Sequence, residues 1–237
     1  MAKLKYKKVL LKLSGEVFGG KGGEGIDGGV LTKLAKEVKS LQKMGCKLGI
    51  VIGGGNIWRY RDFKHLELGR VTSDTMGMFA TCMNALAFEN VLKGMGAEVR
   101  AVSAFPCEKA MENYVPKRAK HLMEDGKIVI FAGGTGSPFF TTDSAAALRA
   151  LEMECDVLLK ATKVDYVYDK DPMKYKNAKK YEKMSFDEVI EKNLGIMDLT
   201  CASLCKAGGM KMLVFNLNTK DSIKKAVSGG KIGTVVD

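Results

Sequence analysis

Residues 127–153 read KIVIFAGGTGSPFFTTDSAAALRALEM, and this stretch decides the fold. Its first six residues form a short apolar run rich in β-branched side chains, which predicts a buried strand over 127–132. Gly133, Gly134 and Gly136 then predict a tight turn. Apolar residues return at helical spacing behind a Ser/Thr/Asp start, which predicts a capped helix over 142–153. A strand, a glycine turn and a helix in this order are typical of an α/β protein.

The same alternation runs along the rest of the chain. Further strands are predicted at 8–13, 47–52, 98–103, 156–160, 212–217 and 233–236. Further helices are predicted at 30–44, 74–95, 115–124, 186–192, 200–208 and 222–228. Strands that are apolar on both faces belong to a mostly parallel sheet covered on both sides. We therefore predict a three-layer α/β/α sandwich, with ligands at the carboxyl ends of its strands.

The composition is that of a globular protein, with 46% apolar and 27% charged residues and a net charge of +11. This charge favours anionic partners such as nucleotides, nucleic acid or acidic metabolites. The six cysteines lie mostly in apolar runs without metal-binding spacing, which indicates core residues in a reducing compartment. A catalytic thiol is the less favoured alternative. The absence of cysteine and histidine at metal-binding spacing predicts no metal site made of side chains. No signal-like or membrane-spanning stretch is present, so we expect a soluble, cytoplasmic chain.

Two common nucleotide-binding motifs are absent. Residues 15–21 have the G-x4-G-K spacing of a P-loop, but Gly22 stands where Ser or Thr would bind magnesium. Lys21 also lies well past the predicted strand instead of at the start of a helix. No clean G-x-G-x-x-G joins a strand to a helix. If the protein binds phosphate groups, it therefore uses neither a P-loop nor a dinucleotide-binding turn.

Two turns in the first part of the chain are suited to phosphate. Lys12 interrupts the buried-looking run Val9–Leu13 just before Ser14 and Gly15, and we expect it to point along the sheet toward the crevice. Three glycines at 53–55 follow a buried strand, where backbone N–H groups can approach an anion and a following helix start would add a favourable field. Arg59 can add a bidentate contact. A solvent-facing lysine and a merely tight turn are the structural alternatives.

Two later turns have the same character. The loop at 133–143 combines hydroxyl donors, two phenylalanines and a carboxylate, so it is either a pyrimidine pocket or a set of core anchors. The segment at 160–172 leaves a strand with lysines, hydroxyls and tyrosines in succession, and a solvated charged loop is its alternative. No Ser or Cys has a nearby His. Phosphoryl transfer to an acceptor that is already a phosphate needs no such pair, because positioning and charge neutralisation suffice.

At this point the motifs can be compared with a known family. The strings KLSGE, VIGGGN, RVTSDTMGM, AGGTGSPFFTTDSAA, LKATKVDYVYDKDP, LGIMDL and VFNLN occur in this order. They resemble those of bacterial UMP kinases, a branch of the amino acid kinase family. The resemblance implies one amino acid kinase domain over 1–237, with a UMP-binding lobe at about 1–155 and an ATP-binding lobe at about 156–237. It implies transfer of the γ-phosphoryl group of Mg·ATP to UMP in pyrimidine nucleotide biosynthesis.

The resemblance also implies roles for individual residues. The catalytic residues would be Lys12, Arg59, Asp143 and Lys160. The residues that contact ATP would be Lys12, Leu13, Ser14, Gly15, Gly55, Arg59, Thr162, Tyr168 and Asp171. The residues that contact UMP would be Gly54, Asp74, Thr135, Gly136, Ser137, Pro138, Phe139, Phe140, Thr141 and Thr142. An effector loop would comprise Gly20, Lys21, Gly22, Gly23, Glu24 and Gly25. A helix N-cap is the alternative role for Asp74.

The family's other properties give the expected partners. Magnesium would be held chiefly by the nucleotide, the enzyme would be a homohexamer, and GTP would activate it while UTP inhibits it. Ser137 and Trp58 depart from the commonest family residues. The rival interpretations are another kinase of this fold, acting on a carboxylate, carbamate or isoprenoid phosphate, and a nucleic-acid-binding protein. The PFFTT loop and Asp74 speak against the first, and the lack of a zinc finger, an RRM signature or a basic helix speaks against the second.

Overall fold

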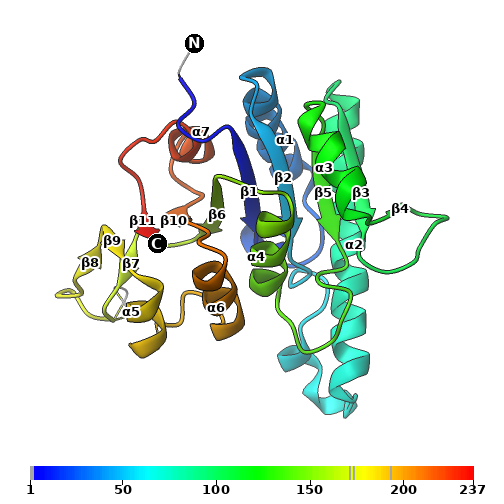
Figure 1. The fold of residues 1–237 in the computed structure, drawn as a ribbon. Helices are drawn as coiled ribbons and strands as arrows, with labels where there is room; N and C mark the ends of the chain where they lie inside the picture. Colours follow the sequence, from blue (N-terminus) through cyan, green and yellow to red (C-terminus); the bar gives the residue numbers. More distant parts are fainter. Residues whose placement is uncertain (1–2, 171, 173, 193) are drawn as a thin grey trace.

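A nine-stranded sheet forms the centre of the computed structural model, which describes the chain except for residues 1, 2, 171, 173 and 193 (Figure 1). Its strand order is β4-β3-β5-β2-β1-β6-β10-β11-β9. The strands are β1 (Lys8–Leu13), β2 (Lys47–Ile52), β3 (Val99–Ser103), β4 (Glu112–Asn113), β5 (Ile128–Ala132), β6 (Val157–Thr162), β9 (Lys183–Met184), β10 (Met212–Asn216) and β11 (Thr234–Val236). The paired strands run parallel except β10 and β11. The predicted parallel sheet is confirmed.

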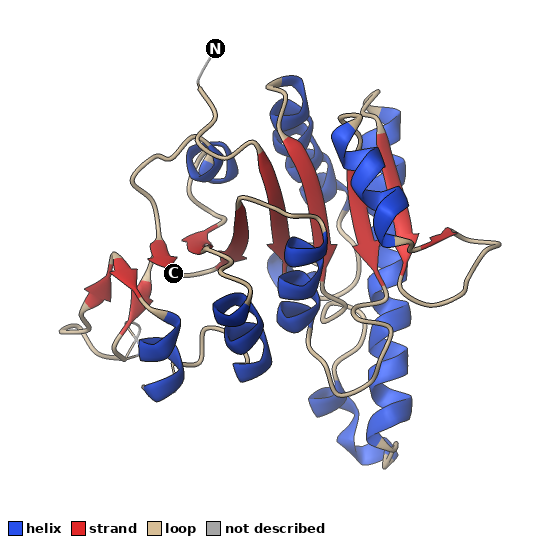
Figure 2. Cartoon of the chain, viewed as in Figure 1, coloured by secondary structure: helices blue, strands red, loops and turns tan. Residues whose placement is uncertain are grey.

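Helices cover both faces of this sheet (Figure 2). They are α1 (Gly28–Lys43), α2 (Arg70–Gly94), α3 (Pro116–Glu124), α4 (Thr142–Glu152), α5 (Phe186–Glu191), α6 (Leu199–Ala207) and α7 (Ser222–Val227). One core packs α1, α2 and α7 against the sheet, and a second core packs α3, α4, α5 and α6 against the other face. The architecture is therefore the predicted three-layer α/β/α sandwich.

The alternation of side chains along two central strands decides where the site can form. In β1, Val9, Leu11 and Leu13 belong to the first core, whereas Leu10 belongs to the second. Because side chains alternate between the faces of a sheet, Lys12 points to the face that α4 covers. The neighbouring strand β6 pairs in register with β1, and Lys160 is the direct partner of Lys12. Two lysines thus lie side by side beneath α4.

The structure corrects some element boundaries. Helix α2 begins at Arg70 and not at residue 74, so Asp74 is not an N-cap; Gly69 precedes the helix without a side-chain cap. Strand β6 extends two residues past its predicted end because Phe215 and Asn216 of β10 continue the ladder. No helix starts directly after the glycines at 53–55, since Ile57 N and Trp58 N both donate to Gly54 O in a turn. A 3-10 helix, η3 (Tyr60–Leu66), follows.

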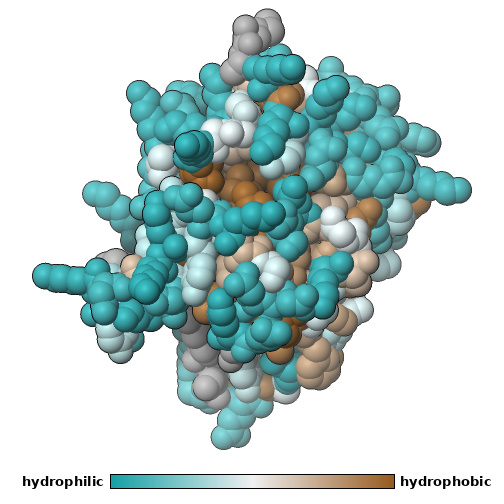
Figure 3. All heavy atoms as spheres, turned by 60° about the vertical axis from the view of Figure 1, so that its left-hand side comes forward, coloured by the Kyte–Doolittle hydropathy of each residue, from teal (hydrophilic) through white to brown (hydrophobic). Residues whose placement is uncertain are grey.

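Several short elements were not predicted, because two or three residues carry no periodicity. They include β4, β9 and a separate small sheet of β7 (Val167–Tyr168) and β8 (Lys180–Tyr181). The 3-10 turns η1 (Gly15–Val17) and η2 (Gly20–Gly22) lie in the glycine-rich segment after β1. None of the helices in the described residues is both long and apolar enough to cross a membrane. The face turned forward in Figure 3 is mostly hydrophilic.

The cysteines pack as the sequence predicted. Five of the six are buried and Cys107 is half-buried, and all six are free thiols. Burial raises the pKa of Cys46 and of Cys155 to about 12, and that of Cys82 to about 11. A nucleophilic cysteine needs a lowered pKa and access to solvent, so these three thiols are not suited to catalysis.

Candidate functional site

A charged cluster of Lys12, Asp143 and Lys160 lies at the carboxyl end of the central strands. Asp143 stands in the first turn of α4, directly above the two paired lysines. Its Oδ1 lies 2.8 Å from Lys12 Nζ, and its Oδ2 accepts a short hydrogen bond from Lys160 Nζ. The exposed fractions of the three side chains are 13%, 16% and 9% in chain order. One carboxylate therefore holds two lysines together in a nearly buried position.

The protonation states of this cluster follow from its surroundings. Burial by itself raises the pKa of Asp143, but the charges of Lys12 and Lys160 outweigh burial and hold that pKa below its usual value. Burial lowers the pKa of Lys160, and the neighbouring Lys12 lowers it further, while Asp143 opposes both. Asp143 is therefore an ionised counterion and not a proton donor. The cluster carries one net positive charge when both lysines are protonated.

The glycine turn after β2 packs closely against the turn after β1. A Cβ on Gly15 would lie 2.6 Å from Gly53 O and Gly55 N, and a Cβ on Gly54 would lie 2.7 Å from the backbone of Gly77 in α2. These two glycines are thus required for packing. A Cβ on Gly55 would meet no atom nearer than 3.5 Å, and those atoms belong to the Arg59 side chain. Gly55 is the member of the turn whose backbone is open to an approaching anion.

Arg59 connects this turn to two other loops. Its Nε donates a short hydrogen bond to Gly55 O, and its Nη2 lies 3.5 Å from Gly23 O in the glycine-rich loop. The carboxylate of Glu16 lies 3.5 Å from Arg59 Nη2 and 2.7 Å from Lys163 Nζ. Loops after β1, β2 and β6 therefore meet around Glu16 and Arg59.

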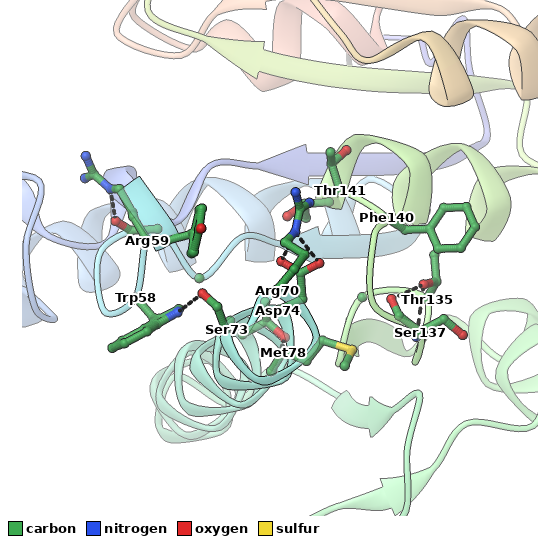
Figure 4. Close-up of a pocket in the computed structure, with 17 residues that line it drawn as sticks. Trp58, Arg59, Arg70, Ser73, Asp74, Met78, Thr135, Ser137, Phe140 and Thr141 are labelled. Carbon is green, nitrogen blue, oxygen red and sulfur yellow. Dashed lines mark hydrogen bonds and ion pairs between the residues drawn. The ribbon is translucent and has the colours of Figure 1, made fainter. Parts of the chain in front are cut away.

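A first cavity of about 440 Å³ opens beside this junction (Figure 4). Its lining comes from the glycine turn, the start of α2 and the loop between β5 and α4. The predicted site residues among them are Gly54, Gly55, Arg59, Asp74, Thr135, Ser137, Phe140, Thr141 and Thr142. Trp58, Tyr60, Arg70, Ser73 and Met78 line it as well. The cavity joins two of the four predicted turns, the glycine turn after β2 and the loop after β5, whereas none of the described residues of 12–15 and 160–172 lines it.

The carboxylate of Asp74 is engaged from two sides. Arg70 Nε lies 2.8 Å from both of its oxygens, and the backbone N–H of Phe139 donates to Oδ2 at 2.8 Å. The Phe139 ring is 65% exposed, and the residue has a positive φ of 71°. Positive φ is strained for a bulky residue, so the bond to Asp74 helps to hold the loop in this conformation.

The loop between β5 and α4 is shaped by its own hydroxyls. Thr135 Oγ1 accepts from Ser137 N at 3.2 Å, which closes a small turn. Thr141 is the N-cap of α4 and accepts from the backbone N–H groups of Asp143 and Ser144. The sequence predicted a capped start here, and Thr141 is the residue that caps it. This cap places Asp143 over the lysines.

A second cavity of about 360 Å³ lies on the other side of Thr141 and Thr142. The charged cluster lines it, together with Asp198 and the residues just before α6. Asp198 caps α6 through the N–H of Cys201 at 2.9 Å, and it also accepts from Ser144 Oγ at 2.7 Å and from Thr141 Oγ1 in a short bond. The two cavities therefore share a wall at the start of α4.

Not every predicted residue lies in a cavity lining. Gly136, Pro138 and Phe139 belong to the β5–α4 loop, and Leu13, Ser14 and Gly15 to the turn after β1, but none of them is among the residues that line either cavity. Thr162 ends β6, where its Oγ1 donates to Phe215 O at 3.1 Å, and Tyr168 lies in β7. Asp171 lies outside the described residues.

Three residues of the site were not predicted from the sequence, although each stands inside a quoted motif. Asp198 and Glu16 have partners that are distant in the chain, whereas Arg70 pairs with Asp74 one turn later. Asn84 is fully buried, donates to Gly53 O at 2.8 Å and pairs with Asn56. A buried asparagine inside an apolar helix is a signal for such a role, because buried amides need partners.

The charged residues near the two cavities do not form a metal cage. In the described residues no group of three or more His, Cys, Asp or Glu is placed to hold a metal ion. Asp143, the carboxylate nearest the lysines, already has a cation on each oxygen. A magnesium ion in this region would therefore depend mainly on phosphate oxygens and water, which is a common way for proteins to bind it.

Comparison with known proteins identifies the family. A UMP kinase from Ureaplasma parvum is 35% identical over 99% of this chain and 100% of that chain, with a TM-score of 0.93. A UMP kinase from Bacillus anthracis is 35% identical over 98% and 96%, also with a TM-score of 0.93. A uridylate kinase from Archaeoglobus fulgidus is 26% identical over 97% and 100%, with a TM-score of 0.74. The family model described as the amino acid kinase family matches residues 7–216, which include both cavities, and the chain belongs to that family.

Proposed function

We propose that this protein is a UMP kinase, which transfers the γ-phosphoryl group of Mg·ATP to UMP and releases UDP and ADP. The observation that carries the proposal is the charged cluster of Lys12, Asp143 and Lys160, which lines the second cavity across a shared wall from the first. Two phosphate-bearing substrates repel each other, so a transferase must neutralise charge where they meet. The similarity to two bacterial UMP kinases over nearly the whole chain supports the choice of acceptor.

On the donor side, the second cavity provides the cations. Lys12 and Lys160 face it, and both can contact phosphate oxygens without leaving Asp143. Preorganised charges stabilise a transferring phosphoryl group because they need no rearrangement during the reaction. Asp143 keeps the two lysines close despite their mutual repulsion. Lys12 and Lys160 are therefore proposed as catalytic residues, and Asp143 as the residue that positions them.

On the acceptor side, the first cavity is lined by groups suited to a nucleoside monophosphate. Gly55 and Arg59 line it at the glycine turn, where the acceptor phosphate would bind. Asp74 accepts hydrogen bonds only, which suits ribose hydroxyls. Phe140 is 49% exposed in the lining and offers an aromatic face to a base. The acceptor phosphate is its own nucleophile, so no general base is needed.

Magnesium is the expected companion of ATP. When bound with the nucleotide, this ion would supply positive charge that offsets the charge of the phosphates. The chain's own part is to hold the nucleotide through the backbone of residues 12–15 and the residues Thr162, Tyr168 and Asp171. We divide the single domain into a UMP-binding lobe at about 1–155, whose residues 12–15 also reach the ATP phosphates, and an ATP-binding lobe at about 156–237.

Two surface features support the expected regulation and assembly. The loop from Gly20 to Gly25 contacts Arg59 through Gly23 O, which connects the proposed GTP site to the reacting groups. Helix α2 exposes Met76, Phe79 and Met83 by 37%, 52% and 52%, and their spacing puts them in one stripe. Such a stripe suits contact between copies in the proposed homohexamer. Light scattering should show a smaller assembly for Met83→Glu than for the wild type.

One assay tests the proposed function. Purified protein with Mg·ATP is offered UMP, CMP, AMP, carbamate and glutamate in turn, and ADP release is measured. UMP should be the preferred acceptor, and UTP should inhibit the reaction. Preference for carbamate or glutamate would reassign the chain to another branch of its family.

A further inference from the structure

A salt bridge occupies the middle of the first cavity (Figure 4). Arg70 is the first residue of α2, and Asp74 lies one turn later on the same helix. The guanidinium contacts both carboxylate oxygens and also lies over the Phe139 ring, 5.6 Å from its centroid. The pair therefore ties the start of α2 to the loop between β5 and α4.

The two partners differ in their freedom to move. The side chain of Arg70 is 50% exposed, whereas that of Asp74 is 18% exposed. Asp74 is also held by Phe139 N at 2.8 Å. Arg70 can therefore shift toward solvent when a ligand enters, while the carboxylate stays in place.

The position of this carboxylate creates an electrostatic problem. A nucleoside monophosphate in the first cavity brings a phosphate with negative charge, and it also removes water from Asp74. A lone carboxylate would repel the phosphate and lose its hydrogen bonds to water. Arg70 offsets both effects, because it neutralises the charge and keeps a donor on each oxygen.

The contact between Arg70 and Asp74 also determines how many of the hydrogen bonds of the Asp74 carboxylate must come from the ligand. An ionised carboxylate can accept about four hydrogen bonds. Arg70 and Phe139 N occupy some of these positions and leave others free for ribose hydroxyls. When a ligand lacks one hydroxyl, the carboxylate still has its charged partner. Without Arg70, the ligand hydroxyls would become the main partners of Asp74.

We propose that Arg70 is a specificity-determining residue, which acts as the counterion of Asp74 and sets how strongly the acceptor site selects ribose over 2′-deoxyribose. The inference rests on the proposed function, since it takes a uridine monophosphate as the ligand of the first cavity. With Arg70 in place the selection is moderate. Removal of Arg70 weakens binding of both UMP and dUMP, and it increases the ratio of their dissociation constants in favour of UMP.

The chain offers a matched control on the same helix. Lys93 and Glu89 also form a salt bridge four residues apart in α2, at 2.9 Å, in which Lys93 is 45% and Glu89 13% exposed. Neither residue lines the first cavity. If Arg70 only stabilised its helix, as exposed pairs of this spacing do, then loss of either cation would have the same small effect.

Binding can be followed through the chain's single tryptophan. Trp58 lines the first cavity, and its indole N–H donates to Ser73 Oγ at 3.0 Å. Titration of Trp58 fluorescence gives Kd for UMP and for dUMP in the wild type, Arg70→Met, Arg70→Lys and Lys93→Met. Arg70→Met should raise Kd about tenfold for UMP and about fiftyfold for dUMP, because the desolvated carboxylate then lacks its charged partner. Arg70→Lys should stay near the wild-type ratio, and Lys93→Met should match the wild type.

The outcomes separate this inference from the proposed function. If Arg70→Met raises Kd by the same factor for UMP and dUMP, Arg70 has a purely structural role. If the ratio of Kd for dUMP to Kd for UMP becomes smaller, Arg70 itself contacts the 2′-hydroxyl. Either result overturns the inference. If the wild type neither binds UMP nor phosphorylates it, the proposed function fails first, and that failure appears in the wild-type measurement alone.

Discussion

The charged cluster of Lys12, Asp143 and Lys160 and the first cavity lie on opposite sides of Thr141 and Thr142, yet different kinds of structure hold them in place. Sheet register pairs the two lysines, and both are nearly buried. The first cavity depends on loops, on a half-exposed arginine and on a phenylalanine with positive φ. The comparison teaches that the proposed catalytic lysines are preorganised, whereas the proposed acceptor pocket is adaptable.

The sharpest test of the preorganised side is Asp143→Ala. The variant leaves Lys12 and Lys160 adjacent in a nearly buried position without their counterion, which should cost about 3–5 kcal/mol of stability. Because its pKa is lowered in the fold, the stabilising effect of Asp143 is complete above the ordinary carboxyl pKa and is lost as pH falls below it. Urea unfolding at neutral and acidic pH should therefore show a difference between wild type and variant that shrinks in acid. A difference independent of pH would contradict the proposed pairing.

Lys12→Ala probes the same cluster without leaving a buried charge unpaired. Asp143 keeps Lys160 as a partner, so the fold should survive. Loss of one preorganised cation should reduce turnover by about 10²–10³-fold, or about 2–4 kcal/mol of transition-state stabilisation. Initial rates at saturating Mg·ATP and UMP measure this, with circular dichroism as the control for folding. Near-normal turnover in a folded variant would remove Lys12 from the catalytic residues.

Asp74→Ala tests the adaptable side. Ribose hydroxyls lose their acceptor, so kcat/KM for UMP should fall by about 1–3 kcal/mol, while kcat/KM for dUMP should fall less. The ratio of the two values in wild type and variant is the measurement. Equal discrimination in both proteins would leave Asp74 as a purely structural partner of Arg70 and Phe139.

The contrast between the two regions also explains what could be predicted from the sequence. The strands and their parallel pairing follow from patterns that extend over several residues, whereas the catalytic roles for Lys12 and Asp143 come only from the family resemblance. A lysine inside an apolar strand is a strong signal because its charge needs a partner on the buried face. Period-two alternation then indicates which face that is.

The rest depends on contacts that no local pattern encodes. The start of α2 was placed four residues too late because Ser73 and Asp74 resemble a helix cap, whereas Arg70 supports a turn before them. Asp198 lies in the site only because α6 packs against α4, although the two helices are far apart in the sequence. The packing roles of Gly15 and Gly54 depend on backbone distances in the folded state.

The alkaline limb of the pH profile should report Lys160. Burial lowers its pKa below the usual value for lysine, so the free enzyme loses this cation at a lower pH than an ordinary lysine would. A profile of kcat/KM for Mg·ATP follows the free enzyme. It should therefore fall on the alkaline side, and Lys160→Arg should move that fall to higher pH because arginine keeps its proton. An unchanged limb in a Lys160→Arg variant that remains active would assign the titration to another group.

The smallest expected effect concerns the loop from Gly20 to Gly25, which lies outside both regions but contacts the arginine between them. Gly23 O accepts from Arg59 Nη2, and Gly25 N donates to Asn56 O at 2.8 Å, so a ligand on this loop can shift the glycine turn. GTP should raise the initial rate at subsaturating ATP about fivefold, the low end of ordinary allosteric coupling. Lys21→Ala should reduce this activation and leave the rate without GTP unchanged, because Lys21 is exposed and lines neither cavity. Lys36→Ala, an exposed lysine on α1, is the control. A rate that does not respond to GTP in the wild type would remove the effector role, and equal activation in wild type and Lys21→Ala would move the effector site elsewhere on the surface.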